Sequence, residues 1–222
     1  MSGLHQYKKQ IDLLMKKILL LAFTATVMLG ACKKENDEPK EEANVTINGQ
    51  SYTTVKIGTQ TWTAVNYNGT GGEDHSSGDV SYGKLYTWEE AKGIQLPSGW
   101  RLPSKEDYEE LLKVAGGEKT EFGYWGNWDV SKKLISTKGW SVEQGTNTLG
   151  FNAVPAGLVM KDTEQKFENK GESAVFWSTT KVSATNENRF VFYVYVDNSY
   201  KETTIESDYR YYKASIRFVK DN

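Results

Sequence analysis

The segment Gly99-Trp100-Arg101-Leu102-Pro103-Ser104 organises the middle of this chain. Ser104 is typical of a helix N-cap, with Asp107 as its capping-box partner, because a side-chain oxygen there accepts a hydrogen bond from a backbone N–H that the first turn leaves unpaired. Apolar side chains follow at the spacing of one helix face: Tyr108, Leu111, Leu112 and Ala115. Gly116-Gly117 then ends the pattern. We therefore expect an amphipathic helix directly after this turn.

A shorter helix is expected just before the turn. Leu85, Trp88 and Ala91 recur at helical spacing with charged residues between them, and Gly93 follows. Two helices would thus flank the turn, and the rest of the folded region is typical of strands and loops.

Strand patterns dominate both ends of the folded region. Asn48-Gly49 is a strong hairpin signal, because both turn positions favour positive φ, and a second pairing is expected between residues 53–57 and 61–65. Later strand candidates are residues 174–178, 190–196 and 214–219. The run 190–196 is apolar or aromatic throughout, which places it in the middle of a sheet.

These elements together predict an α+β fold. The first and last strands bracket the others, so we expect the two ends of the domain to meet in one sheet. Residues 66–83 are rich in Gly, Ser and Asp and predict a long loop.

The N-terminal region carries a targeting signal. Lys16 and Lys17 precede an apolar run at residues 18–29, which is well short of the roughly 20 residues that span a bilayer, and Leu29-Gly30-Ala31-Cys32 follows. We interpret residues 1–31 as a signal peptide, with Met15 as an alternative translation start. Leu-Gly-Ala-Cys resembles the bacterial lipobox, which implies that Cys32 is lipidated. The alternative is a free thiol that happens to follow a signal peptide.

Cys32 is the only cysteine in the chain, so no intramolecular disulfide and no cysteine-based metal site can form. Residues 32–43 are strongly polar and predict a flexible tether. We expect an outer-membrane lipoprotein, periplasmic or surface-exposed, held to the membrane by its lipid. Acidic residues at Glu35, Asp37 and Glu38 resemble a surface-export signal of Bacteroidota lipoproteins, with a plain solvated linker as the preferred interpretation.

The net charge excludes one class of function. Removing residues 1–32 leaves 23 basic and 28 acidic residues, a net charge of −5. Nucleic-acid binding depends on neutralising phosphates with a basic surface. We therefore expect no nucleic-acid partner.

Six motifs occur together in the folded region: Ile57-Gly58-Thr59-Gln60-Thr61-Trp62, Tyr82-Gly83-Lys84-Leu85-Tyr86-Thr87-Trp88, Gly99-Trp100-Arg101-Leu102-Pro103-Ser104, Gly150-Phe151-Asn152-Ala153-Val154-Pro155-Ala156-Gly157, Phe176-Trp177-Ser178-Thr179-Thr180 and Ile216-Arg217-Phe218-Val219-Lys220-Asp221. In order and spacing they resemble the Fibrobacter succinogenes major paralogous domain family, and the resemblance covers residues 44–222 as one domain. That family resembles the C-type lectin-like fold, which implies two helices packed on a mostly antiparallel sheet with long loops.

Two departures from the family pattern are informative. Members often carry cysteine before the Gly-Trp-Arg-Leu-Pro turn and again in the last strand, where this chain has Leu96 and Phe218. The resemblance implies that a packing contact replaces a disulfide whose loss would cost about 4 kcal/mol, so we expect Leu96 and Phe218 to lie near each other. Formylglycine-generating enzymes share an Arg-Leu-Pro turn but need active-site cysteines, so that activity is excluded.

Residue types for catalysis are scarce. His75 is the only histidine after the signal peptide, so a Ser-His-Asp triad would have to form around one loop residue. Glu73, Asp74 and Asp79 share its loop and offer oxygen ligands of the kind Ca²⁺ prefers. A solvated polar loop is the preferred interpretation, because the spacing matches no EF-hand. We expect no metal, no cofactor and no enzymatic activity, with a glycosidase carboxylate pair as the remaining catalytic alternative.

Aromatic residues give a better lead to function. Five tryptophans beside strands or helices predict core positions: Trp62, Trp88, Trp100, Trp140 and Trp177. Other rings lie among glycines or charged residues and are the candidate ligand contacts: Tyr124, Trp125, Trp128, Tyr200, Tyr209, Tyr211 and Tyr212. Such rings stack on sugar faces or anchor protein interfaces with little loss of side-chain entropy. Packing beneath the loops is the alternative.

We therefore expect a lipid-anchored cell-envelope module that binds a glycan or a partner protein through loop aromatics. A non-catalytic accessory subunit of an outer-membrane assembly is the alternative. A further hypothesis is retroelement-driven diversification of residues 196–212, since some C-type lectin-like lipoproteins vary near the C-terminus.

Overall fold

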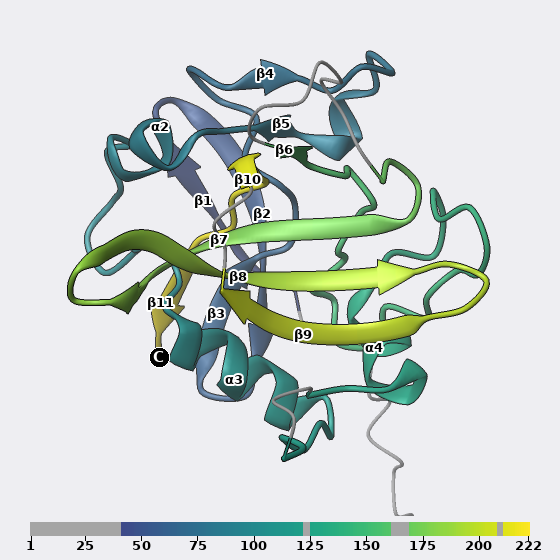
Figure 1. Ribbon diagram of the computed structural model, residues 1–222. Helices are drawn as coiled ribbons and strands as arrows, with labels where there is room; N and C mark the ends of the chain where they lie inside the picture. The colour runs from purple at the N-terminus through teal and green to yellow at the C-terminus, as the bar shows by residue number, and fades with distance from the viewer. Residues whose placement is uncertain (1–40, 122–124, 161–168, 208–210) are drawn as a thin grey trace, which may run out of the picture. The chain divides into compact units, whose positions relative to one another are not determined.

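The computed structural model describes residues 41–121, 125–160, 169–207 and 211–222 (Figure 1). All of these belong to one compact unit, residues 37–222. The predicted signal peptide, Cys32 and the first part of the tether lie outside the described residues.

A four-stranded antiparallel sheet contains both ends of the domain. Its order is β1 (Glu41–Ile47), β2 (Gln50–Ile57), β3 (Gln60–Thr63) and β11 (Val219–Asp221). The hairpin prediction is confirmed at the turn, where Asn48 and Gly49 have φ values of 49° and 82°. The first and last strands share this sheet, as expected. Residues 41–43 belong to β1, which pairs with β2, and so are not part of a free tether.

The second sheet has three antiparallel strands, β7 (Ser173–Ser183), β8 (Asn186–Val196) and β9 (Lys201–Ser207). The central strand is β8, as its apolar run predicted. The edge strand β9 was not predicted, because its sequence is mostly polar. Its buried positions are Thr203 and Thr204, whose β-branched side chains suit a strand.

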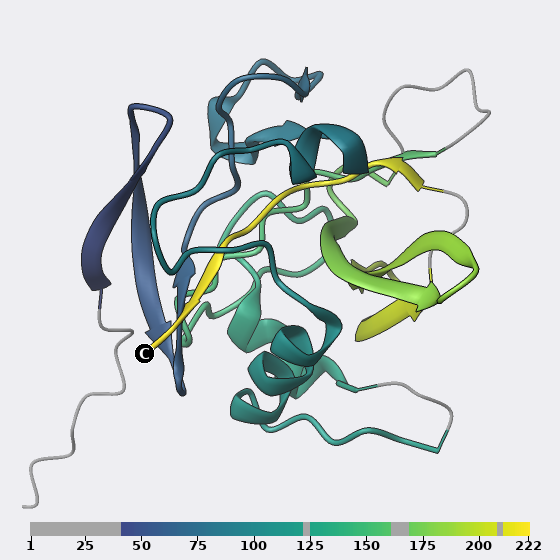
Figure 2. The ribbon, with the colours of Figure 1, turned by 90° about the vertical axis from the view of Figure 1, so that its left-hand side faces the viewer.

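The predicted strand at residues 214–219 is corrected. Ala214 bridges Tyr86 and Ser215 bridges Phe176 as isolated pairs, and a regular ladder begins only at Val219. This segment therefore crosses from the three-stranded sheet to the four-stranded one, which Figure 2 shows as the yellow trace between them.

Short pairings order the loops. The loop at residues 66–83 contains β4 (Glu73–Asp74) and the 3₁₀ turn η1 (Val80–Tyr82), and β4 pairs with β5 (Lys84–Leu85). A second short ladder joins β6 (Val159–Met160) to β10 (Tyr211–Lys213).

Three α-helices are present among the described residues: α2 (Trp88–Lys92), α3 (Lys105–Val114) and α4 (Trp128–Leu134). The capping box of Ser104 and Asp107 is confirmed at the start of α3. α4 is additional to the two helices that the sequence predicted. In the part of the chain that the structure describes, no helix is long and apolar enough to cross a membrane.

Aromatic rings fill the core between the sheets and α3. Tyr108 of α3 stacks on Phe192 of β8 with centroids 4.7 Å apart, and Trp62 of β3 lies 5.4 Å from Tyr108. A second apolar cluster contains Phe218, and Leu96 packs against this cluster. Of the tryptophans predicted for the core, Trp62, Trp140 and Trp177 are buried, whereas Trp88 and Trp100 are half-buried.

Candidate functional site

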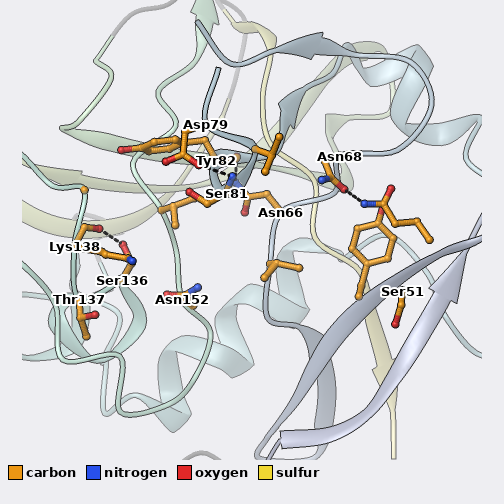
Figure 3. Close-up of a pocket in the computed structure, with 16 residues that line it drawn as sticks. Ser51, Asn66, Asn68, Asp79, Ser81, Tyr82, Ser136, Thr137, Lys138 and Asn152 are labelled. Carbon is orange, nitrogen blue, oxygen red and sulfur yellow. Dashed lines mark hydrogen bonds between the residues drawn. The ribbon is translucent and has the colours of Figure 1, made fainter. Parts of the chain in front are cut away.

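A pocket of about 460 Å³ lies where several loops meet (Figure 3). Its walls come from the start of β2, the loop around η1, residues 136–139 after α4, and the segment 152–154. Most polar lining side chains carry an amide or a hydroxyl: Gln50, Ser51, Asn66, Asn68, Ser81, Ser136, Thr137 and Asn152. Asp79 and Lys138 add one negative and one positive charge. We call this the Asn152 pocket.

The buried guanidinium of Arg217 supports the floor of this pocket. Its Nε donates to Asn66 Oδ1 at 2.8 Å, and its terminal nitrogens donate to the backbone carbonyls of Thr63, Phe151 and Asn152 at 2.7, 2.7 and 2.9 Å. Burial lowers the pKa of Arg217. Four hydrogen bonds to neutral oxygens offset the hydration that the cation loses.

Asn66 connects Arg217, below the pocket floor, to the segment that carries Tyr82. Its Nδ2 donates to the backbone carbonyl of Tyr82 at 2.9 Å and to Ser215 Oγ at 3.1 Å, while Oδ1 accepts from Arg217. Both ends of the Asn66 amide are therefore engaged, and Asn66 fixes the position of Tyr82.

Asn152 has a different role. Its backbone is left-handed, with φ of 55°, and is held by an N–H bond to Asn147 Oδ1 at 2.7 Å and by the bond from Arg217 to its carbonyl. Its side-chain amide makes no hydrogen bond to any described residue and lies in the pocket (Figure 3). Asparagine tolerates this conformation better than most residues, so the backbone here needs no glycine. The side-chain amide of Asn152 is therefore available inside the pocket.

Tyr82 forms the wall opposite Asn152. The ring of His75 stacks on it, with centroids 4.3 Å apart and an interplanar angle of 12°. A Cβ at Gly139 would lie 3.0 Å from the Tyr82 hydroxyl, so the glycine lets the tip of the ring reach the facing loop. Tyr82 therefore spans one end of the pocket.

His75 is buried although its neighbours at residues 76–81 are exposed, so the expectation of a solvated polar loop is corrected at this one position. Burial and then the positive charge of Lys170 lower the pKa of His75. Its Nδ1 accepts from the backbone N–H of Ser77 at 3.3 Å. The packing against Tyr82 gives His75 a structural role in the wall of the pocket.

The acidic residues of the same loop are engaged separately. Glu73 pairs with Lys213 at 2.8 Å and Asp74 with Lys84 at 3.3 Å, while Asp79 accepts from Ser81 N–H at the start of η1. Across the described ranges, no three His, Cys, Asp or Glu side chains are grouped as a metal ion requires. The calcium alternative therefore gains no support from this geometry.

The candidate aromatic contacts have different environments. Trp125 is only 6% exposed and belongs to the core, whereas Tyr200 is 61% exposed. Trp128 is half-buried, with Lys201 Nζ 5.4 Å from its ring centroid. Two positions, Tyr124 and Tyr209, lie outside the described residues, as do the side chains of Tyr211 and Tyr212.

The expectation of an exposed ring is corrected for Trp125. The next residue, Gly126, exchanges two backbone hydrogen bonds with Thr203 of β9, at 3.1 and 3.2 Å, which fixes this segment against the sheet. Trp125 nevertheless lines a groove of about 530 Å³ together with Tyr200, Glu118 and Glu202. We call this the Tyr200 groove.

A family model, the Fibrobacter succinogenes major domain, matches residues 55–220. The chain belongs to this family. No curated protein and no solved structure gives a match.

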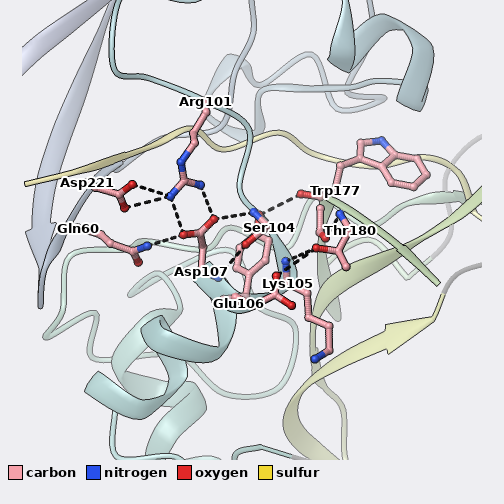
Figure 4. A network of polar contacts seen from close by, with 11 residues as sticks. Gln60, Arg101, Ser104, Lys105, Glu106, Asp107, Trp177, Thr180 and Asp221 are labelled. Carbon is pink, nitrogen blue, oxygen red and sulfur yellow. Dashed lines mark hydrogen bonds and ion pairs between the residues drawn. The ribbon is translucent and has the colours of Figure 1, made fainter. Parts of the chain in front are cut away.

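Motifs typical of the Fibrobacter succinogenes major domain meet at the start of α3 (Figure 4). Arg101 binds both carboxylate oxygens of Asp107 and both of Asp221, the latter at 3.0 Å. Asp107 also accepts from the Ser104 N–H at 2.6 Å and from Gln60 Nε2 at 2.5 Å. Burial would raise the pKa of Asp107, but the hydrogen bonds from Arg101 and then Ser104 lower it. This network ties three of the six motifs together.

No sequence pattern indicated a ligand role for Arg217, Asn66 or Asn152. One signal was present: Arg217 interrupts an apolar terminal segment, and a charge among core residues needs buried partners. The partners of Arg217 lie 65 to 154 positions away in the sequence, so the signal could not show which residues they were.

Proposed function

We propose that this protein is a lipid-anchored module of the bacterial outer membrane that binds a glycan or a partner protein, on a C-type lectin-like scaffold. The Leu29-Gly30-Ala31-Cys32 motif supports the anchor. The observation that carries the binding role is the Asn152 amide, which lies in a polar pocket with no hydrogen-bond partner among the described residues, whereas the neighbouring Asn66 is fully hydrogen-bonded.

The pocket has the character of a ligand site. Its volume lies within the range of about 300–1,000 Å³ that holds small ligands. The floor is already fixed by Arg217, so binding would cost little ordering of the protein. Among the described lining residues Asp79 is the only acidic one, whereas glycoside hydrolysis uses two carboxylates. Binding is therefore favoured over catalysis.

Glycan arrays and envelope pull-downs with the detergent-solubilised full-length protein test the binding role. We expect a ligand in at least one screen, and we expect Asn152→Gly to reduce its capture. A folded protein that captures nothing in either screen would refute the proposal.

The anchor needs a separate test. Metabolic labelling with an alkyne analogue of palmitate should mark the protein, and Cys32→Ala should abolish both the label and partition into the detergent phase. Labelling that survives this substitution would contradict lipidation at Cys32.

A second candidate function is that of a non-catalytic accessory subunit, favoured by the exposed ring of Tyr200. A photo-crosslinking residue placed at Tyr200 should capture one defined envelope protein in cells. The matched control is Val142, another exposed apolar side chain, which is not among the residues that line the groove. Equal capture at both positions would count against a docking role for Tyr200.

A further inference from the structure

We propose that the Asn152 pocket holds an uncharged, hydroxyl-rich ring, that is, one neutral sugar residue, and that it does so without a metal ion. This inference rests on the proposed binding function and names the ligand class for the same pocket.

The hydrogen-bonding groups of the pocket favour hydroxyls. The free amide of Asn152 offers two donors and an acceptor. Asn68 accepts from Gln50 at 2.6 Å through Oδ1, which leaves its own amide hydrogens for another acceptor. A hydroxyl is both donor and acceptor and can satisfy such mixed groups, whereas a carboxylate accepts only and an ammonium donates only.

The charges of the pocket give no net preference for an ionic ligand. Asp79 and Lys138 carry opposite charges and line the same pocket, so the described lining has no net charge. Arg217 does not change this balance directly, because it is fully buried and its donors already bind four protein oxygens. The guanidinium is therefore not available for the bidentate pairing by which arginine recognises anions.

The opposite wall suits the apolar face of a sugar ring. Tyr82 is half-buried and is backed by His75, so its orientation is fixed. Val80 and Val154 add apolar surface beside it. A sugar presents hydroxyls at its edge and C–H groups on its face, which suits a pocket that combines amide side chains with an aromatic ring.

The left-handed backbone of Asn152 allows a clean test. Glycine adopts the same φ without strain, so Asn152→Gly removes the amide and keeps the loop. The matched control is Asn169→Gly, the same change at another left-handed asparagine, with φ of 53°, that does not line the pocket. Asn152→Asp, which has nearly the same shape and also tolerates this conformation, provides a second variant if the glycine variant unfolds.

The experiment is an isothermal calorimetric titration of the detergent-solubilised full-length protein. The probes are methyl glycosides of glucose, galactose and mannose, with the matching uronates and 2-amino sugars. We expect at least one neutral glycoside to bind about tenfold more tightly than its charged analogues. Asn152→Gly and Asn152→Asp should each weaken that binding about tenfold, while Asn169→Gly and EDTA leave it unchanged.

Three results would overturn this inference. Tighter binding of a uronate or an amino sugar would show that the pocket selects charge, and would leave the proposed binding function standing. Unchanged affinity in both Asn152 variants would place the sugar elsewhere. If none of these glycosides binds, the inference of a neutral sugar fails, and the pull-down with Asn152→Gly then decides whether the pocket binds another ligand.

Discussion

Arg217 donates from Nε to the side-chain carbonyl of Asn66 at 2.8 Å, and both side chains are at least 97% buried. The bond joins the last segment of the chain to the loop that follows β3. It pairs a cation with a neutral amide, whereas a buried arginine is commonly paired with a carboxylate. The pocket floor is therefore held by a charge that has no counter-ion among its described hydrogen-bond partners.

Replacing Arg217 should destabilise the protein strongly. Arg217→Met leaves the carbonyls of Thr63, Phe151 and Asn152 buried without this donor, and we expect a loss of about 3–5 kcal/mol in the free energy of unfolding. Urea unfolding measures the change. Lys220→Met, a partly exposed position in β11, should change stability by less than about 1 kcal/mol. Similar losses in the two variants would contradict the role of Arg217.

Asp107 should make stability sensitive to acid. Burial alone would raise its pKa, but the hydrogen bonds from Arg101 and Ser104 hold the folded pKa below the unfolded value of about 3.9. The stabilisation is therefore complete above that value and is lost as the pH falls through the lower folded pKa. Asp107→Asn should cost about 2 kcal/mol at pH 7 and flatten the profile below about pH 4.

The comparison variant for Asp107 is Glu110→Gln, since Glu110 lies on the same helix in an exposed pair with Lys113 at 3.7 Å. An exposed pair of this kind contributes little, so its unfolding profile should follow the unmodified protein. Parallel acid profiles for Asp107→Asn and the unmodified protein would contradict the assignment.

Leu96 and Phe218 belong to one apolar cluster, which permits a test of the contact expected to replace a disulfide. Phe218 is fully buried and packs edge-on to Tyr67 at 5.4 Å, so Phe218→Ala should cost about 3–5 kcal/mol. Leu96→Ala should cost about 1–2 kcal/mol, because Leu96 is half-buried. If the two side chains touch, the double variant should depart from additivity by more than about 0.5 kcal/mol.

The reference pair for this cycle is Leu96 with Phe192, which belongs to the other cluster. Those two changes should be additive within about 0.5 kcal/mol. Additivity in both pairs would mean that Leu96 and Phe218 share a cluster without direct contact.

His75 should respond to pH in a second window. Burial, and then the charge of Lys170, hold its folded pKa below the unfolded value of about 6.5. The unfolded chain then binds the proton more readily, so stability is complete above about pH 6.5 and declines as the pH falls below it. His75→Phe keeps a ring against Tyr82 and should flatten this slope, as measured by unfolding between pH 7.5 and the acid window of Asp107. An unchanged slope would show that another group is responsible.

Local signals made part of the fold predictable. The turn at Asn48-Gly49, the cap of α3 at Ser104 and the apolar run of β8 each depend on residues adjacent in the sequence, and all three are confirmed. β9 was missed because an edge strand can be polar on most positions, and its burial is carried by Thr203 and Thr204.

The site was less predictable because it is assembled from distant segments. Trp125 lies near glycines in the sequence, which suggested an exposed loop. It is buried because the backbone of Gly126 pairs with Thr203, a residue that is distant in the sequence. The amide groups of Asn66 and Asn152 cannot be told apart in the sequence. They differ because the side chain of Asn66 has hydrogen-bond partners at positions 82, 215 and 217. The sequence does not show that these positions meet.

The position of Arg217 near the end of the chain has a consequence for biosynthesis. A polypeptide delivered N-terminus first can complete the opening hairpin early, but the oxygens of Thr63 and Phe151 must wait for nearly the whole chain before Arg217 reaches them. A product of premature termination would therefore lack the floor of the pocket. Its carbonyls at Thr63 and Phe151 would lack their buried donor, and the loops that meet there would be less stable.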